Sequence, residues 1–180
     1  MKKILITALS IFTLGGVLQA QSVATGVSDW YAERYLGARA TFEKLQAANP
    51  NDIQATYWLG QTYIEMRDLP AARGVYEKGL ASSANAPLLE VGMGQVELEE
   101  NKINEARQRF EKAITMSTNG KKGTEPDILN AVGRAIANTY TDQDRRGDIN
   151  FAVIKLEEAA NSKTKDNALL ADIYVNLGNA

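Results

Sequence analysis

A seven-residue segment occurs three times in this chain with a 34-residue period, and this period constrains the fold more than any other feature. The segment reads ARATFEK at residues 38–44, ARGVYEK at 72–78 and ARQRFEK at 106–112. Ala, Arg, Glu and Lys are identical in all three copies, and the fifth position is always aromatic. Gly60 and Gly94 are separated by the same interval. Repeats of about 20–50 residues are typical of arrays in which each unit packs against its neighbours.

Each unit is expected to contain two helices. Apolar and small residues recur every three or four positions in residues 53–66 and again in 69–80, which is the period of a helix face. Pro70 suits the first turn of the second helix, because its missing N–H has no partner there in any case. Gly60 and Ala72 are small enough for the two helices to cross closely. No stretch in which apolar and polar residues alternate is long enough to predict a strand.

These repeated positions resemble the signature of the tetratricopeptide repeat (TPR) family, in its exported bacterial form. The residues that carry the resemblance are small, apolar or aromatic: Leu59, Gly60, Tyr63, Ala72 and Tyr76, then Ala106, Phe110 and Ala113, and earlier Ala38, Phe42 and Pro50. The resemblance implies an all-α fold, a right-handed superhelical solenoid of antiparallel helix pairs. It covers residues 29–180, after a short segment at 21–28. Its units are expected at about 29–52, 53–86, 87–118 and 126–161, with a partial unit at 167–180.

The repeat period is interrupted after Met116. A polar loop at 117–125 precedes a predicted helix at 126–138, and a long polar turn at 141–148 precedes another at 149–160. Residues 167–180 resemble the first helix of a further unit, with an apolar stripe that includes Tyr174 and is expected to face the preceding helix. Because no second helix follows, we expect the sequence to be a fragment of a longer protein, or this helix to be a terminal cap.

Residues 1–20 have the layout of a secretory signal peptide. A basic start is followed by an uncharged apolar stretch at 4–18 and then by small and polar residues. The stretch is shorter than the roughly 20 residues that span a bilayer, which disfavours a membrane anchor. Cleavage is predicted between Ala20 and Gln21, or secondarily between Ser22 and Val23. We therefore expect an exported protein, periplasmic or associated with the cell envelope, with no membrane span after cleavage.

The amino-acid composition limits the kinds of catalytic and metal site that the chain can form. The 180 residues include no His and no Cys, which removes the most common general base, the thiol nucleophile and the most common zinc ligands. A net charge of −2 disfavours binding to nucleic acid. Residues 142–153 resemble part of a calcium loop, but Arg146 and Val153 stand where oxygen ligands are required. No catalytic residue, metal or cofactor is expected.

The TPR resemblance also implies a partner groove on the concave face, lined by the first helix of each pair. Helical counting gives its candidate residues as Gln54, Tyr57, Gln61, Glu65, Leu88, Gln95, Glu99, Asn130, Arg134 and Asn138. These are expected on the exposed side of their helices, where amides can pair with the backbone of an extended segment. An ordinary solvated helix surface is the alternative interpretation.

The sequence therefore favours a non-enzymatic scaffold of the bacterial envelope that binds a protein or an extended peptide on its concave face. The alternative is the N-terminal repeat region of a larger exported enzyme or envelope assembly factor, with a working domain beyond Ala180. Self-association through the open face of the last repeat is a third expectation, because an unpaired helix leaves apolar surface uncovered.

Overall fold

The computed structural model describes residues 22–118, 125–141 and 144–180, and these ranges contain helices and no strands. The helices are α1 (Val23–Tyr31), α2 (Tyr35–Ala48), α3 (Ile53–Glu65), α4 (Leu69–Ser82), α5 (Pro87–Glu99), α6 (Ile103–Thr118), α7 (Pro126–Thr139), α8 (Ile149–Ala160) and α9 (Asn167–Asn179). The helices expected within residues 53–80 and 126–180 are confirmed, with ends that differ by at most two residues. The predicted signal peptide and the Ala20–Gln21 cleavage site lie outside the described ranges, whereas the second predicted site, between Ser22 and Val23, lies at the start of α1.

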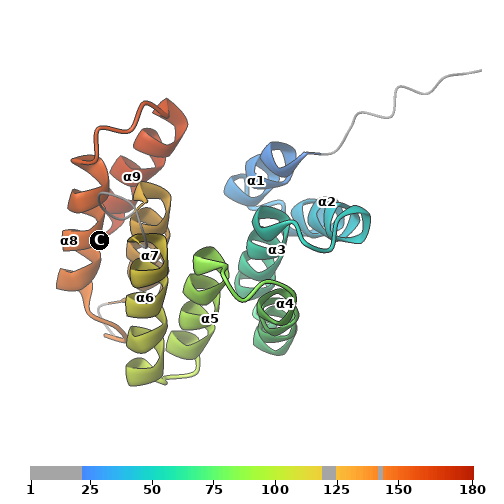
Figure 1. Ribbon diagram of the computed structural model, residues 1–180, viewed down its shortest axis with the longest axis horizontal. Helices are drawn as coiled ribbons and strands as arrows, with labels where there is room; N and C mark the ends of the chain where they lie inside the picture. Colours follow the sequence, from blue (N-terminus) through green and yellow to red (C-terminus); the bar gives the residue numbers. More distant parts are fainter. Residues whose placement is uncertain (1–21, 119–124, 142–143) are drawn as a thin grey trace, which may run out of the picture.

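The helices form two layers. The odd-numbered helices contact one another in series, from α1 to α9, and make the inner layer. Each even-numbered helix packs on the odd-numbered helix before it and on the one after it, so that α2, α4, α6 and α8 make the outer layer. Figure 1 shows the pairs following one another along a curved array. The architecture is an all-α solenoid of helix pairs.

The first pair begins earlier than the sequence pattern suggested. The repeat region was expected from residue 29, whereas α1 begins at Val23, where the Ser22 hydroxyl accepts a hydrogen bond from the Thr25 amide. Gly26 explains the difference, because it precedes Gly60 by one repeat period and is part of the same repeat. Residues 23–28 therefore belong to the first helix pair and do not form a separate segment.

A glycine in the first helix and an aromatic ring in the second helix hold each of the first three pairs together. Gly26, Gly60 and Gly94 each precede their aromatic partner by the same interval in the sequence. A Cβ atom added at these glycines would lie 2.5 Å from Phe42, 2.2 Å from Tyr76 and 2.6 Å from Phe110, respectively. All three rings are almost completely buried. The repeated residues thus serve close helix packing, as predicted.

The turn inside each of these pairs contains a residue with left-handed backbone geometry. Glu33, Arg67 and Asn101 have φ values of 56°, 62° and 61°, and they too follow one another at the repeat period. At Arg67, the amide donates to Ile64 O and the next amide donates to Tyr63 O, both at 2.9 Å. These bonds satisfy carbonyl groups that the end of α3 leaves without helical partners. The turn thereby reverses the chain between two consecutive helices.

No helix in the described ranges is both long enough and apolar enough to cross a membrane.

Candidate functional site

The guanidinium of Arg134 lies at the centre of the inner layer. Arg134 is on α7, within a largely apolar helix, and is 4% exposed. Its Nη1 donates to the Tyr31 hydroxyl of α1 at 3.0 Å and to Asp172 Oδ2 of α9 at 3.2 Å. Its Nη2 donates to the Tyr57 hydroxyl of α3 at 3.0 Å. One side chain therefore connects four helices that span most of the described sequence.

Aromatic rings surround this cation. The guanidinium carbon lies 4.6 Å from the centre of the Trp58 ring and 5.9 Å from the centres of the Trp30 and Tyr57 rings. Trp30 and Trp58 are the only tryptophans of the chain, and their ring centres are 5.3 Å apart in an edge-to-face arrangement. Contact with aromatic faces stabilises a cation that has lost its water.

The surroundings keep Arg134 charged. Burial acts to lower its pKa, but Tyr57, Tyr31 and Asp172 act in the opposite direction and the net effect is a raised pKa. The pKa of Tyr31 is also raised, mainly by burial, which outweighs the opposing effect of Arg134, and the hydrogen bond to Asp172 raises it further. Tyr31 is therefore a neutral phenol that accepts from Arg134 and donates to Asp172.

Asp172 provides the carboxylate that faces Arg134. It also accepts a hydrogen bond from Asn130 Nδ2 of α7 at 2.5 Å, and Asn176 Nδ2 of α9 donates to Asn130 Oδ1 at 2.9 Å. Arg134 Nε is buried without a hydrogen-bond partner. We name the group formed by Trp30, Tyr31, Tyr57, Trp58, Asn130, Arg134, Asp172 and Asn176 the Arg134 cluster.

The candidate groove residues are far less exposed than the helical count suggested. Gln54 and Asn138 are exposed, and Glu65 and Glu99 are half-buried. The remaining six are buried, namely Tyr57, Gln61, Leu88, Gln95, Asn130 and Arg134. Neighbouring helices cover these six side chains, so the expectation that the candidate residues form an exposed row is wrong for most of them. Their role in binding a partner stays a prediction.

The amides expected to bind a partner backbone instead bind the protein itself. Gln61 Nε2 donates to Gln95 Oε1 at 2.9 Å and to the Tyr76 hydroxyl at 3.0 Å. The two glutamines occupy the same repeat position on α3 and α5. The Tyr76 hydroxyl in turn donates to Tyr57 O at 3.1 Å. This network therefore joins two successive repeats.

Helical counting found Tyr57, Asn130 and Arg134 but missed the other members of the cluster, namely Trp30, Tyr31, Trp58, Asp172 and Asn176. One signal was present in the sequence, because Arg134 is the only charged residue between Ile128 and Asn138, and a lone charge in an apolar helix is typically buried with a partner. The partners themselves come from both ends of the chain, and the repeat pattern does not indicate them.

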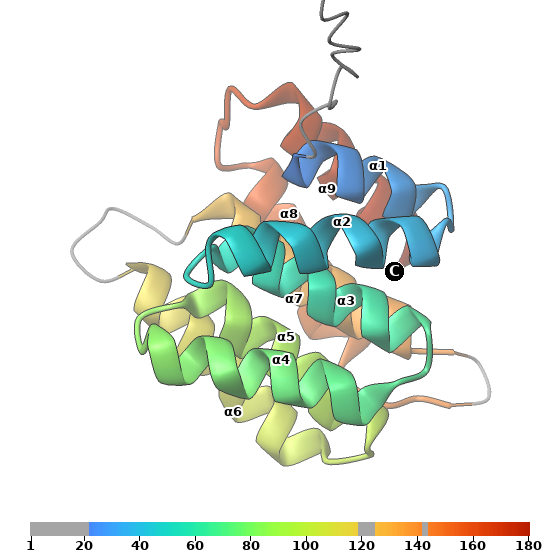
Figure 2. The same ribbon diagram turned by 90° about the vertical axis from the view of Figure 1, so that its right-hand side faces the viewer.

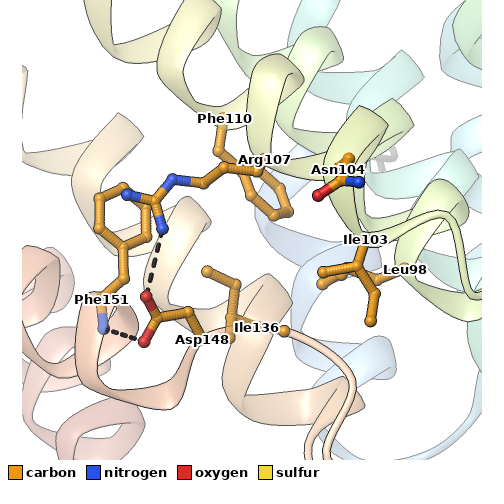
Figure 3. Close-up of a pocket in the computed structure, with 9 residues that line it drawn as sticks. Leu98, Ile103, Asn104, Arg107, Phe110, Ile136, Asp148 and Phe151 are labelled. Atoms are coloured by element: carbon orange, nitrogen blue, oxygen red, sulfur yellow. Dashed lines mark hydrogen bonds and ion pairs between the residues drawn. The ribbon is translucent and has the colours of Figure 1, made fainter.

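A cavity of about 200 Å³ lies elsewhere, between α6 and α8 of the outer layer. Its walls are mainly apolar, from Leu98, Ile103, Phe110, Ile136 and Phe151, with Gly147 also contributing. As Figure 3 shows, Arg107 and Asp148 lie at one side of it. Arg107 Nη1 is 3.3 Å from Asp148 Oδ2, and the guanidinium carbon is 3.7 Å from the centre of the Phe151 ring.

Residues 23–87 match the family model for the tetratricopeptide repeat. The matched region contains two copies of the repeated segment and the first two helix pairs. This region is a tetratricopeptide repeat (TPR) segment. The helix-pair architecture continues beyond the matched region, since α5 with α6 and α7 with α8 form further pairs.

Several solved structures are similar to this chain. MamA shares 15% sequence identity, over 86% of this chain and 91% of its own, with a TM-score of 0.44. TTC0263, a thermophilic TPR protein of Thermus thermophilus, shares 18% over 86% and 96%, with a TM-score of 0.43. YrrB, described as a TPR protein with an unusual peptide-binding site, shares 18% over 84% and 71%, with a TM-score of 0.43. No curated protein matches the sequence.

The side chains of the Arg134 cluster can make several kinds of non-covalent contact. They offer a cation, aromatic faces, amides and one carboxylate, but no thiol or imidazole. Across residues 22–118, 125–141 and 144–180, no group of three potential metal ligands comes together. Residues 142 and 143, which belong to the partial calcium-loop pattern, lie outside these ranges.

Proposed function

We propose that this TPR protein is a non-enzymatic scaffold of the bacterial cell envelope that binds an extended segment of a partner protein on its inner layer. Stacked helix pairs of this family provide a protein-interaction architecture, which supports the general role. The envelope location rests on the leader-like layout of residues 1–20.

The Arg134 cluster is the observation that carries the proposed site. A buried ion pair contributes little to stability compared with an apolar packing of the same volume, so its presence needs another reason. Here the pair lies on the inner layer, where four helices converge, and Tyr31 at its edge is 48% exposed. Charge, amides and aromatic faces at one place are what recognition of a polypeptide segment requires.

Site-specific photo-crosslinking in the producing cell tests this proposal. A photoreactive amino acid is placed at Tyr31 and Asn138, exposed positions of the inner layer, and at Gly74 and Glu105, exposed positions of the outer layer. The same partner peptide should be crosslinked at both inner positions and at neither outer one. Crosslinks confined to the outer positions would contradict the proposed face.

The envelope location has its own test. Cell fractionation with intact-mass measurement should find the protein outside the cytoplasm, beginning near Gln21. A cytoplasmic protein that retains residues 1–20 would contradict this part of the proposal without affecting the inner-layer site.

Self-association through α9 is a further proposal, supported by its exposed side chains. Tyr174 and Val175 are 58% and 55% exposed. The expectation that Tyr174 faces the preceding helix is wrong, because Ile173 and Asn176 are the buried residues of α9. Sedimentation velocity of the protein and of a Tyr174→Ser, Val175→Ser variant should show association that the variant lacks. A protein that stays monomeric at every concentration would refute it.

A further inference from the structure

In a repeat array each helix pair contacts only its neighbours, and the contacts of the Arg134 cluster depart from that rule. Tyr31 of α1 donates a hydrogen bond to Asp172 of α9, although 141 residues separate them. Arg134 of α7 binds both side chains. We propose that Tyr31, Arg134 and Asp172 form a latch that holds the two ends of the array together and closes the inner layer. Release of the latch would admit a partner segment, and this consequence rests on the proposed function.

The latch is the link between the two ends. The backbones of α1 and α9 do not approach one another closely, since α1 packs on α2 and α3, and α9 on α7 and α8. Their apolar residues also belong to different clusters. Trp30 of α1 is part of the main core, whereas Ile173 of α9 packs with Leu129 and Ala159 in a separate small cluster. Figure 2 shows α1 and α9 at the same end of the molecule.

Charge makes this link dependent on Asp172. Arg134 is 4% exposed, and Asp172 is the carboxylate that forms an ion pair with it. If α9 moves away, a buried cation loses its counter-charge, which is strongly unfavourable unless water or another group reaches it. The Asp172 side chain is 20% exposed, so water has access to the edge of the latch. The Arg134 guanidinium is therefore paired with Asp172 when the array is closed and is accessible to water or another group when it is open.

The outer layer provides room for the movement. The step from α6 to α7 has sparser contacts than the equivalent steps from α2 to α3 and from α4 to α5. The cavity lined by Phe110 and Phe151 lies beside this step, between α6 and α8 (Figure 3). Since α5 and α7 pack closely, rotation about their contact that carries α9 away from α1 would carry α8 toward α6.

Distance measurements on the full protein test the latch without any partner. Because the chain has no Cys, the exposed positions Ala24 of α1 and Ala168 of α9 can be changed to Cys and spin-labelled specifically. The labelled parent should give one short, narrow distance distribution. Asp172→Asn should add a population at longer distances. Glu158→Gln, an acid-to-amide change in an ion pair within α8, is the matched control and should leave the distribution unchanged.

A second measurement separates opening from unfolding. Trp30 and Trp58 are 7% and 8% exposed, and both lie at the latch, so acrylamide quenching of tryptophan fluorescence reports directly on this site. Asp172→Asn should increase quenching while the helical circular dichroism is retained. If this variant loses its helical signal, Tyr31→Phe, which removes one hydroxyl, becomes the deciding variant and should show the same two changes to a smaller extent.

Two results would overturn the latch. One is a distance distribution and a quenching constant that stay at parental values in a folded Asp172→Asn or Tyr31→Phe variant. The other is a parent protein whose distribution is already as broad as that of the variants. Neither result depends on whether a partner segment binds, so failure of the latch and failure of the proposed function are distinguishable.

Discussion

Replacement of Gly60 by Ala adds one methyl group at the closest contact between α3 and α4. The new Cβ would lie 2.2 Å from Cζ of Tyr76 and 2.4 Å from Cε1. The ring cannot move away to relieve this clash, because on its other side a Cβ at Gly92 of α5 would lie 2.3 Å from the same Cζ. Tyr76 is 0% exposed and is therefore held between two helix backbones.

The expected cost follows from these contacts. Overpacking a well-packed core costs about 1–3 kcal/mol. Displacement of the ring also weakens the hydrogen bonds of the Tyr76 hydroxyl with Tyr57 O and Gln61 Nε2, worth about 1 kcal/mol each. The better helix propensity of Ala returns about 1 kcal/mol. Gly60→Ala should therefore destabilise the protein by about 2 kcal/mol.

Gly74→Ala is the matched control, since it makes the same substitution inside a helix. A Cβ at Gly74 of α4 meets nothing within 4 Å, so only helix propensity changes and the variant should gain about 0.5–1 kcal/mol. Urea unfolding followed by far-ultraviolet circular dichroism should move the two midpoints in opposite directions. A midpoint for Gly60→Ala at or above that of the parent would refute the ring-on-glycine packing.

A double-mutant cycle then identifies the ring as the cause. Tyr76→Leu removes the atoms that a Cβ at Gly60 would meet, so the double variant should be more stable than the sum of the two single changes predicts. The expected coupling is about 0.5–3 kcal/mol. If the two single free-energy changes simply add, the cost of Gly60→Ala does not come from contact with the Tyr76 ring.

Three further predictions concern stability. Burial acts to raise the pKa of Glu90, but hydrogen bonds from Lys112 and Arg109 lower it overall, so its contribution to folding stability is present above the unfolded pKa of about 4.3 and is lost as pH falls below it. Glu90→Gln should therefore lower the melting temperature at pH 7 and make the melting temperature fall less steeply toward acid pH, and equal declines in both proteins would contradict this. Arg67→Gly should gain up to about 1 kcal/mol by relieving the left-handed φ of 62°, whereas Arg67→Ala should gain nothing in the same urea titration. Ala72→Leu should cost about 1–3 kcal/mol because Ala72 is 0% exposed, and an unchanged urea midpoint would show that it has room for growth.

The helices could be predicted because their signals are local. Pro70 and Pro126 lie in the first turns of α4 and α7 as the sequence indicates, and each depends only on the residues of its own helix. The left-handed position in the turns was missed, since of Glu33, Arg67 and Asn101 only Asn favours a positive φ. The geometry of the turn imposes that conformation on whichever residue occupies it.

The candidate site was predicted only in part. Helical counting selected Asn130 and Arg134 as exposed groove residues, but both are buried within the inner layer. It could not show that Gln61 and Gln95 bind one another, nor that Asp172 reaches Arg134. Whether an inner position is open depends on how far the array curves, and helical counting contains no information about curvature.

The sequence by itself determined the repeat, the helix pairs and the close crossing of helices at small residues, because these depend on residues at fixed intervals within one unit or between neighbouring units. Only the tertiary structure decided that the inner layer is closed by Tyr31, Arg134 and Asp172. Small rotations between successive pairs add up along the array, and their sum sets the distance between α1 and α9. A repeat pattern fixes the unit but not the sum of those rotations.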